Sequence, residues 1–157
     1  MEITENNKLE MSNVISYRGK VTQQQMAQIM QELEQIIKEN HASKSGPTVS
    51  ATYAAENDGV QPIMDMEVLI PLDREISVPS GYSFKPVFRL NHAVKVRHTG
   101  NPAMLQNSAN ELMKYITEKQ LMPVTAGYNV VVQEAANPKD VDNLIIDIYV
   151  GVCDNIL

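Results

Sequence analysis

Residues 144–152 read LIIDIYVGV, and residues 63–72 read IMDMEVLIPL. In both stretches polar and apolar side chains alternate, which is typical of a β-strand with two different faces. The polar or aromatic face carries four residues that we take as candidates: Asp65, Glu67, Asp147 and Tyr149. Aligning Asp65 with Asp147 gives an offset of 82 residues (147 − 65) between the two stretches. This alignment predicts an internal repeat in which each copy ends in an acidic-apolar strand.

A helical pattern precedes each of these strands. Thr22 opens the first helix with the spacing of a capping box, and apolar residues follow at helical intervals. Asn101, followed by Pro102, predicts the start of the second helix. The tripeptides 31–33 and 110–112 align the two helices at an offset of 79 (112 − 33). Each half therefore has its helix before its acidic-apolar strand.

Shorter strand patterns complete each half, and they lie at residues 13–19, 48–54, 92–100 and 128–132. We expect an α+β fold of two pseudo-symmetric β-α-β-β repeats. Its sheet would be mostly antiparallel, with two main helices on one face and a central cleft. The alternative is two unrelated α+β halves.

The expected organisation is one domain after a short lead-in. Residues 1–10 contain little that could enter a core, so we expect them to be flexible. Residues 11–157 would form a single effector-binding-like domain. Repeat 1 spans about 11–73, the connection 74–90, and repeat 2 about 91–153.

Composition and charge exclude several classes of protein. The net charge of −6 argues against binding a nucleic-acid backbone, and the longest apolar run is too short to cross a membrane as a helix. The single cysteine, Cys153, forms no internal disulfide, and the N-terminus has no pattern of a signal peptide, so we expect a cytoplasmic protein. No motif for a cofactor, a catalytic nucleophile or a metal site is found, and His92 with His98 lacks a third ligand.

Three segments resemble the GyrI-like effector-binding domain, which is also found attached to multidrug-responsive transcription regulators. They are the turn Arg97-His98-Thr99-Gly100, the helix segment 110–112 and the strand 146–150. The resemblance covers nearly the whole chain from about residue 11. It implies a tandem strand–helix–strand–strand repeat with a small-molecule cleft between its halves, here without a DNA-binding module.

The resemblance also implies a departure at the ligand site. Many family members carry an acidic residue early in the strand after the second helix, where it pairs with cationic ligands. Asn129 is the matching position here, and a neutral amide cannot neutralise a buried cation. A cationic ligand of the family type is therefore not assumed.

The leading hypothesis is a non-enzymatic protein that binds a small apolar or amphipathic ligand in the cleft. Aromatic residues on the strands and the connection would add an apolar wall with hydroxyls. Besides the four residues on the acidic-apolar strands, the predicted ligand-binding residues are Tyr53, Phe84, Tyr128 and Asn129. The alternative for the acidic faces is an ordinary water-facing sheet surface.

Two other functions stay open at this point. One is an adaptor that holds a protein partner on the same surface or on its helices. The other is a small hydrolase, since some relatives use a cleft glutamate with tyrosines, and Glu67 with Tyr149 could imitate that pair. A homodimer is also compatible with the sequence.

Overall fold

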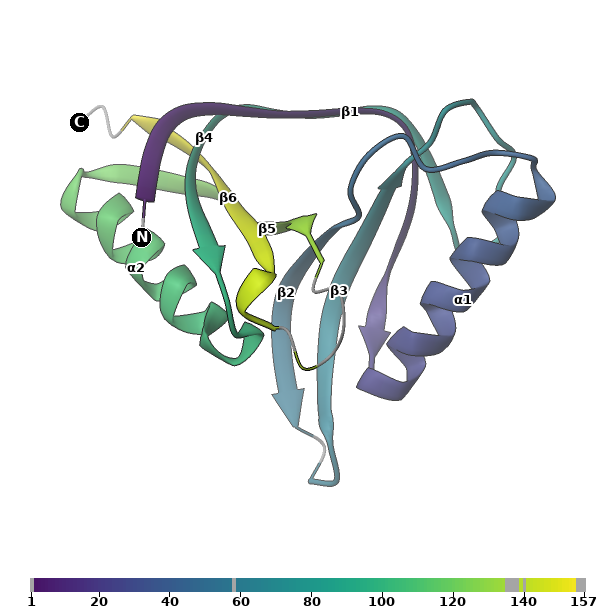
Figure 1. The fold of residues 1–157 in the computed structure, drawn as a ribbon, viewed down its shortest axis with the longest axis horizontal. Helices are drawn as coiled ribbons and strands as arrows, with labels where there is room; N and C mark the ends of the chain where they lie inside the picture. Colours follow the sequence, from purple (N-terminus) through teal and green to yellow (C-terminus); the bar gives the residue numbers. More distant parts are fainter. Residues whose placement is uncertain (1, 58, 135–138, 140, 155–157) are drawn as a thin grey trace. The chain divides into compact units, whose positions relative to one another are not determined.

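A computed structural model describes residues 2–57, 59–134, 139 and 141–154. The chain divides into two compact units: a first unit, Met11–Phe88, and a second unit, Met1–Glu10 with Arg89–Leu157. The elements shown in Figure 1 are, in chain order, β1 (Glu2–Val21), α1 (Gln23–Glu39), β2 (Val49–Asn57), β3 (Pro62–Pro71), β4 (Ser83–Thr99), the 3-10 turn η1 (Pro102–Met104), α2 (Leu105–Glu118), β5 (Leu121–Gln133), η2 (Val141–Asn143) and β6 (Ile145–Asp154). The expected α+β class, with antiparallel strands and two main helices, is confirmed.

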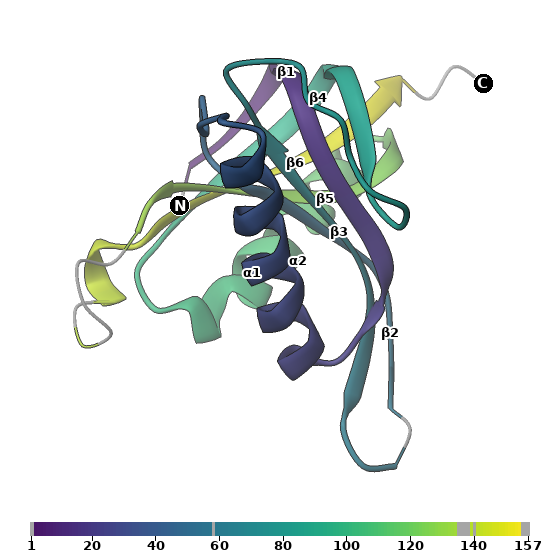
Figure 2. The ribbon, with the colours of Figure 1, turned by 90° about the vertical axis from the view of Figure 1, so that its right-hand side faces the viewer.

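In the first unit, β3 lies between β1 and β2, and both pairings are antiparallel. Arg18 on β1 and Ala51 on β2 both lie opposite Glu67 of β3. The helix α1 covers one side of these strands, where Leu33 packs with Ile70 in the unit's apolar core. Figure 2 shows α1 in front of this unit's strands. The remaining core residues are Ile15, Ile36, Ile37, Val68, Leu72 and Ile76.

The start of α1 follows the sequence prediction closely. The Thr22 hydroxyl accepts a hydrogen bond from the Gln25 amide at 3.2 Å, and the Gln25 side chain accepts one from the Thr22 amide at 2.9 Å. This reciprocal capping box satisfies two backbone donors that a helix start otherwise leaves unpaired. The register of the apolar stripe is thereby fixed, so that Leu33 and its helical neighbours point into the core.

The second unit repeats this order of elements. Here β6 lies between β4 and β5, again in antiparallel pairs, and α2 buries Leu112 and Ile116 against the strands. As predicted, Asn101 caps the helical segment: its side chain accepts a hydrogen bond from the Ala103 amide at 2.9 Å. The core strands contribute Val94, Val96, Ile146, Ile148, Val150 and Val152. Each unit thus buries one helix stripe against one face of three strands.

Three boundaries differ from the sequence expectation. Residues 2–10 are the first half of β1 and not a flexible lead-in, and Ile3 packs against the second unit's core. The strand β4 begins at Ser83, inside the expected connection 74–90. The strand β5 begins at Leu121, directly after α2, because Gln120 has a positive φ of 57° that reverses the chain. The predicted turn at 137–140 lies mostly outside the described residues.

Candidate functional site

The two faces of each three-stranded sheet have different chemistry. Val68 on β3 and Ile148 on β6 belong to the cores beneath α1 and α2. Because side chains alternate along a strand, Glu67 and Asp147 lie on the opposite side of each sheet, which we call the helix-free face. Both carboxylates are nevertheless buried, with 7% of Glu67 and 3% of Asp147 exposed. Each unit therefore has one buried carboxylate on its middle strand, and this carboxylate is the centre of that unit's candidate site.

Glu67 is held by two donors, one on each carboxylate oxygen. The Tyr53 hydroxyl donates to Oε1 at 2.9 Å, and the Lys85 ammonium donates to Oε2 at 2.8 Å. A buried charge is costly unless it is paired and hydrogen-bonded, and both conditions are met here. The buried Glu67 carboxylate therefore has one charged partner and one aromatic hydroxyl as its hydrogen-bond donors.

A second ion pair borders the same tyrosine. The Arg18 guanidinium lies 3.8 Å from the centroid of the Tyr53 ring, and its Nη2 is 3.5 Å from Oδ2 of Asp65. The hydrogen bond to Asp65 raises the pKa of Arg18 above its usual value. Two carboxylates therefore face two cations around Tyr53, and the first unit's polar cluster has no surplus charge.

Asp147 has a different set of partners in the second unit. Arg97 binds it in a bidentate manner, with Nε 2.8 Å from Oδ1 and Nη2 2.9 Å from Oδ2. These hydrogen bonds raise the pKa of Arg97. The Lys95 ammonium stands 3.8 Å from Oδ2 and 5.8 Å from the centroid of the Tyr149 ring. Burial, and next the charge of Asp147, raise the pKa of Tyr149.

The strand registers show which residues of the two units correspond. Arg18 lies opposite Glu67 and Arg97 lies opposite Asp147, at offsets of 79 (97 − 18) and 80 (147 − 67). The register shift after Thr52 in β2 likewise recurs 79 residues later (131 − 52) in β5. The structure thus matches Glu67 with Asp147.

The sequence alignment had instead matched Asp65 with Asp147, and therefore Glu67 with Tyr149. That alignment is two residues out of register. Alternating letters fit any shift by an even number of residues, so the pattern alone could not detect the error. The opposing strand and the repeated bulge supply the missing information.

The other predicted residues divide between the two faces. Tyr128 lies opposite Tyr149, which places it on the helix-free face, where it is buried. Asn129 lies opposite Ile148 and so belongs to the helix-covered side, away from Asp147. Phe84 packs against the first unit's apolar core. The structure therefore does not bring Asn129 or Phe84 to the buried carboxylates.

Four cations at the site were not among the predicted ligand-binding residues: Arg18, Lys85, Lys95 and Arg97. The alternation of Lys95 and Arg97 on a predicted strand was the available signal, because it places both side chains on one face. For Lys85 no such signal exists, since its contact with Glu67 joins residues in separate strands.

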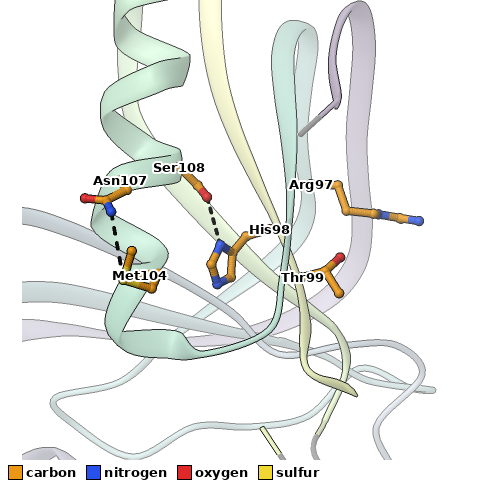
Figure 3. A pocket seen from close by; sticks show the side chains of 6 residues that line it. All are labelled: Arg97, His98, Thr99, Met104, Asn107 and Ser108. Carbon is orange, nitrogen blue, oxygen red and sulfur yellow. Dashed lines mark hydrogen bonds between the residues drawn. The ribbon is translucent and has the colours of Figure 1, made fainter. Parts of the chain in front are cut away.

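A cavity of about 400 Å³ lies where β4 leads into α2. It is lined by Arg97, His98, Thr99, Met104, Asn107 and Ser108, as Figure 3 shows. The backbone carbonyl of Asn101 lies 3.0 Å from Nε2 of His98 and can only accept, so Nε2 carries a proton. In the neutral imidazole, Nδ1 then accepts a hydrogen bond from the Ser108 hydroxyl at 2.8 Å. Both side chains are buried, so the hydrogen bond between Ser108 of α2 and His98 of β4 links the helix to the strand.

In the part of the chain that the structure describes, no three His, Cys, Asp or Glu side chains are grouped as metal ligands. The same part of the chain contains no helix long and apolar enough to span a membrane.

Comparison with known proteins finds similar folds among solved structures. No family model matches the chain, and no curated protein matches it. The chain superposes on EcmrR in a complex with DNA (TM-score 0.78, 17% identity) over 97% of its own length and 58% of that protein. It superposes on the EcmrR C-terminal domain (TM-score 0.73, 14% identity) over 98% of its own length and 99% of the domain.

Two further structures share the architecture. SAV2435, solved with bound tetraphenylphosphonium, matches with a TM-score of 0.54 at 15% identity, over 97% of this chain and 93% of that one. A hydrolase from Listeria innocua matches with a TM-score of 0.58 at 10% identity, over 95% and 93% of the two chains. At these identities the likeness concerns the fold, and this protein has the fold of the EcmrR C-terminal domain.

Proposed function

We propose that this protein binds a small amphipathic molecule on the helix-free faces of its units, in the manner of an effector-binding domain. The observation that carries the proposal is the environment of Glu67, a buried carboxylate beside the Tyr53 hydroxyl and ring. Buried, paired charges next to aromatic surface are common in ligand sites, where they orient a mainly apolar ligand. The fold shared with the EcmrR C-terminal domain and with tetraphenylphosphonium-bound SAV2435 supports the same class of function.

The charge around Glu67 favours a neutral or anionic ligand. A cation approaching Glu67 would compete with Lys85, which donates to the carboxylate at 2.8 Å, and with the Tyr53 hydroxyl. Arg18 close to the Tyr53 ring occupies a place that a ligand cation could otherwise use. We therefore propose that the ligand differs in charge from the tetraphenylphosphonium bound by SAV2435.

Two probes of equal shape and opposite charge test this proposal. Isothermal titration calorimetry with tetraphenylborate and tetraphenylphosphonium should show tighter binding of the borate. The Glu67→Gln variant leaves Lys85 without its partner, so its affinity for the borate should rise and its affinity for the phosphonium should fall. Glu34→Gln, an exposed change on α1, is the control and should alter neither affinity. Binding of neither probe, or equal affinities in wild type and Glu67→Gln, would refute the proposal.

A hydrolase is the second candidate, because Glu67 is buried within hydrogen-bond distance of a tyrosine hydroxyl. In that role Glu67 would take a proton from a water that attacks an ester carbonyl. It ranks second because Lys85 and Tyr53 already occupy both carboxylate oxygens. Hydrolysis of p-nitrophenyl esters that falls at least tenfold in Glu67→Gln, but not in Glu34→Gln, would favour it. The adaptor hypothesis stays a prediction from sequence.

A further inference from the structure

A small polar cavity in the second unit shares no lining residue with the surroundings of Glu67. It has a volume of about 110 Å³ and is lined by Glu2, Thr4, Lys95 and Arg97. Since one water takes up about 30 Å³ in the liquid, this space suits a group the size of a phosphate or a carboxylate. Three of its four lining side chains carry hydrogen-bond donors.

The Lys95 ammonium has N–H donors that form no hydrogen bond within the described residues. Arg97 already binds both oxygens of Asp147 at 2.8 and 2.9 Å, whereas the Lys95 Nζ stands 3.8 Å from the nearer one. That distance is too long for a hydrogen bond, and Lys95 Nζ donates no other hydrogen bond within the described residues. Only 23% of the Lys95 side chain is exposed, so water reaches this charge less easily than it reaches a surface lysine.

Thr4 and Arg97 point to the same kind of ligand. The Thr4 hydroxyl accepts a hydrogen bond from the side-chain amide of Asn7 at 3.0 Å. The hydroxyl proton of Thr4 is therefore available for an acceptor. Arg97 donates hydrogen bonds from Nε and Nη2 to Asp147, and its Nη1 has no acceptor among the residues described. An ammonium, a hydroxyl and a guanidinium nitrogen therefore border one cavity with donors still available.

The charges around the cavity agree with this chemistry. Lys95 and Arg97 face one buried carboxylate, Asp147, which leaves one positive charge in excess. The first unit shows no such excess, because Lys85 donates directly to Glu67 at 2.8 Å. Glu2 is exposed at the rim and is the acidic residue that lines this cavity. It can balance the excess charge when no ligand is present.

We infer that this cavity binds an oxyanion, a carboxylate or phosphate group, through Lys95, Arg97 and Thr4, and that Glu2 competes with it. This inference goes beyond the proposed function, because it requires neither Glu67 nor an amphipathic ligand. The two can fail separately: inorganic phosphate reports on this cavity, and the tetraphenyl probes report on Glu67.

An NMR titration of the full chain tests the inference. Sodium phosphate and sodium acetate are added separately at constant ionic strength, with chloride as the balancing salt. We expect saturable shifts of the backbone amides of Thr4, Lys95 and Arg97 with at least one oxyanion and none with chloride. The tighter of the two oxyanions identifies the preferred head group.

Variants separate a built site from general attraction to positive charge. Lys95→Met should weaken binding at least tenfold, and Lys95→Arg should retain it. Glu2→Gln should strengthen binding severalfold, because it removes the competing carboxylate. Lys114→Met, an exposed change on α2, is the matched control and should have no effect. Unchanged binding in a folded Lys95→Met variant, weaker binding in Glu2→Gln, or the same shifts with chloride would overturn the inference.

Discussion

Replacing Tyr53 with phenylalanine tests the hydrogen bond at the centre of the candidate site. The change removes the 2.9 Å hydrogen bond to Glu67 and keeps the ring that Arg18 contacts. A hydrogen bond to a charged group contributes about 1.5–3 kcal/mol to stability. Because Lys85 still pairs with Glu67 in the variant, we expect the lower part of this range, a loss of about 1.5–2 kcal/mol in the free energy of unfolding. For a chain of this length that corresponds to a fall in Tm of roughly 3–8 °C.

A double-mutant cycle shows whether the loss in the free energy of unfolding comes from the interaction between Tyr53 and Glu67. In the background of Glu67→Gln, the hydroxyl of Tyr53 faces a neutral amide, so Tyr53→Phe should cost clearly less than in wild type. Urea unfolding of the four proteins, followed by circular dichroism, gives the coupling free energy. We expect about 1 kcal/mol or more. Additive effects, with a coupling near zero, would refute the assignment of Tyr53 as the partner that holds Glu67.

Three further predictions concern single side chains. Burial and the Glu32 carboxylate raise the pKa of Tyr82 to about 12, so the folded state keeps a proton that the unfolded state loses near pH 10. The contribution of the protonated Tyr82 to the free energy of unfolding is therefore complete below pH 10 and is lost between about pH 10 and 12. Tyr82 is partly buried against the first unit's apolar core, so the loss between pH 9 and 11.5 should be at most about 2 kcal/mol, and unfolding of wild type and Tyr82→Phe at these two pH values measures it. Ser108→Ala leaves Nδ1 of the buried His98 without its donor and should destabilise the protein by about 1–3 kcal/mol, whereas Ser108→Thr should recover part of this if the hydroxyl is what matters. Thr22→Ala removes the capping box of α1 and should cost about 1 kcal/mol in urea unfolding, while an unchanged midpoint would contradict the role of the cap.

The sequence predicted best what depends on neighbours along the chain. The cap at Thr22 and the cap at Asn101 both lie where the residue types required them. The alternation of β3 and β6 assigned Val68 and Ile148 correctly to the cores, because one face of a half-buried strand must be apolar. These signals involve residues only a few positions apart.

Contacts between separate strands were not predictable in the same way. Lys85 and Glu67 are joined by an ion pair across 18 residues, and nothing in either neighbourhood indicates the partner. Asn129 was predicted to be a ligand-binding residue from the family resemblance, and the register of β5 against β6 places it on the face opposite to Asp147. A shift of one residue exchanges the faces of a strand, so the face of Asn129 depends on register shifts in β5 that the sequence did not indicate.

The position of a bound probe tests the central claim most directly. Tetraphenylborate is titrated into isotope-labelled protein, and the backbone amide shifts are followed by NMR. If the protein binds small molecules on the helix-free face beside Glu67, saturable shifts should centre on Tyr53 and Glu67, with the exposed residues of α1 and α2 unaffected. Shifts confined to the helices, or no saturable shift at all, would contradict the claim.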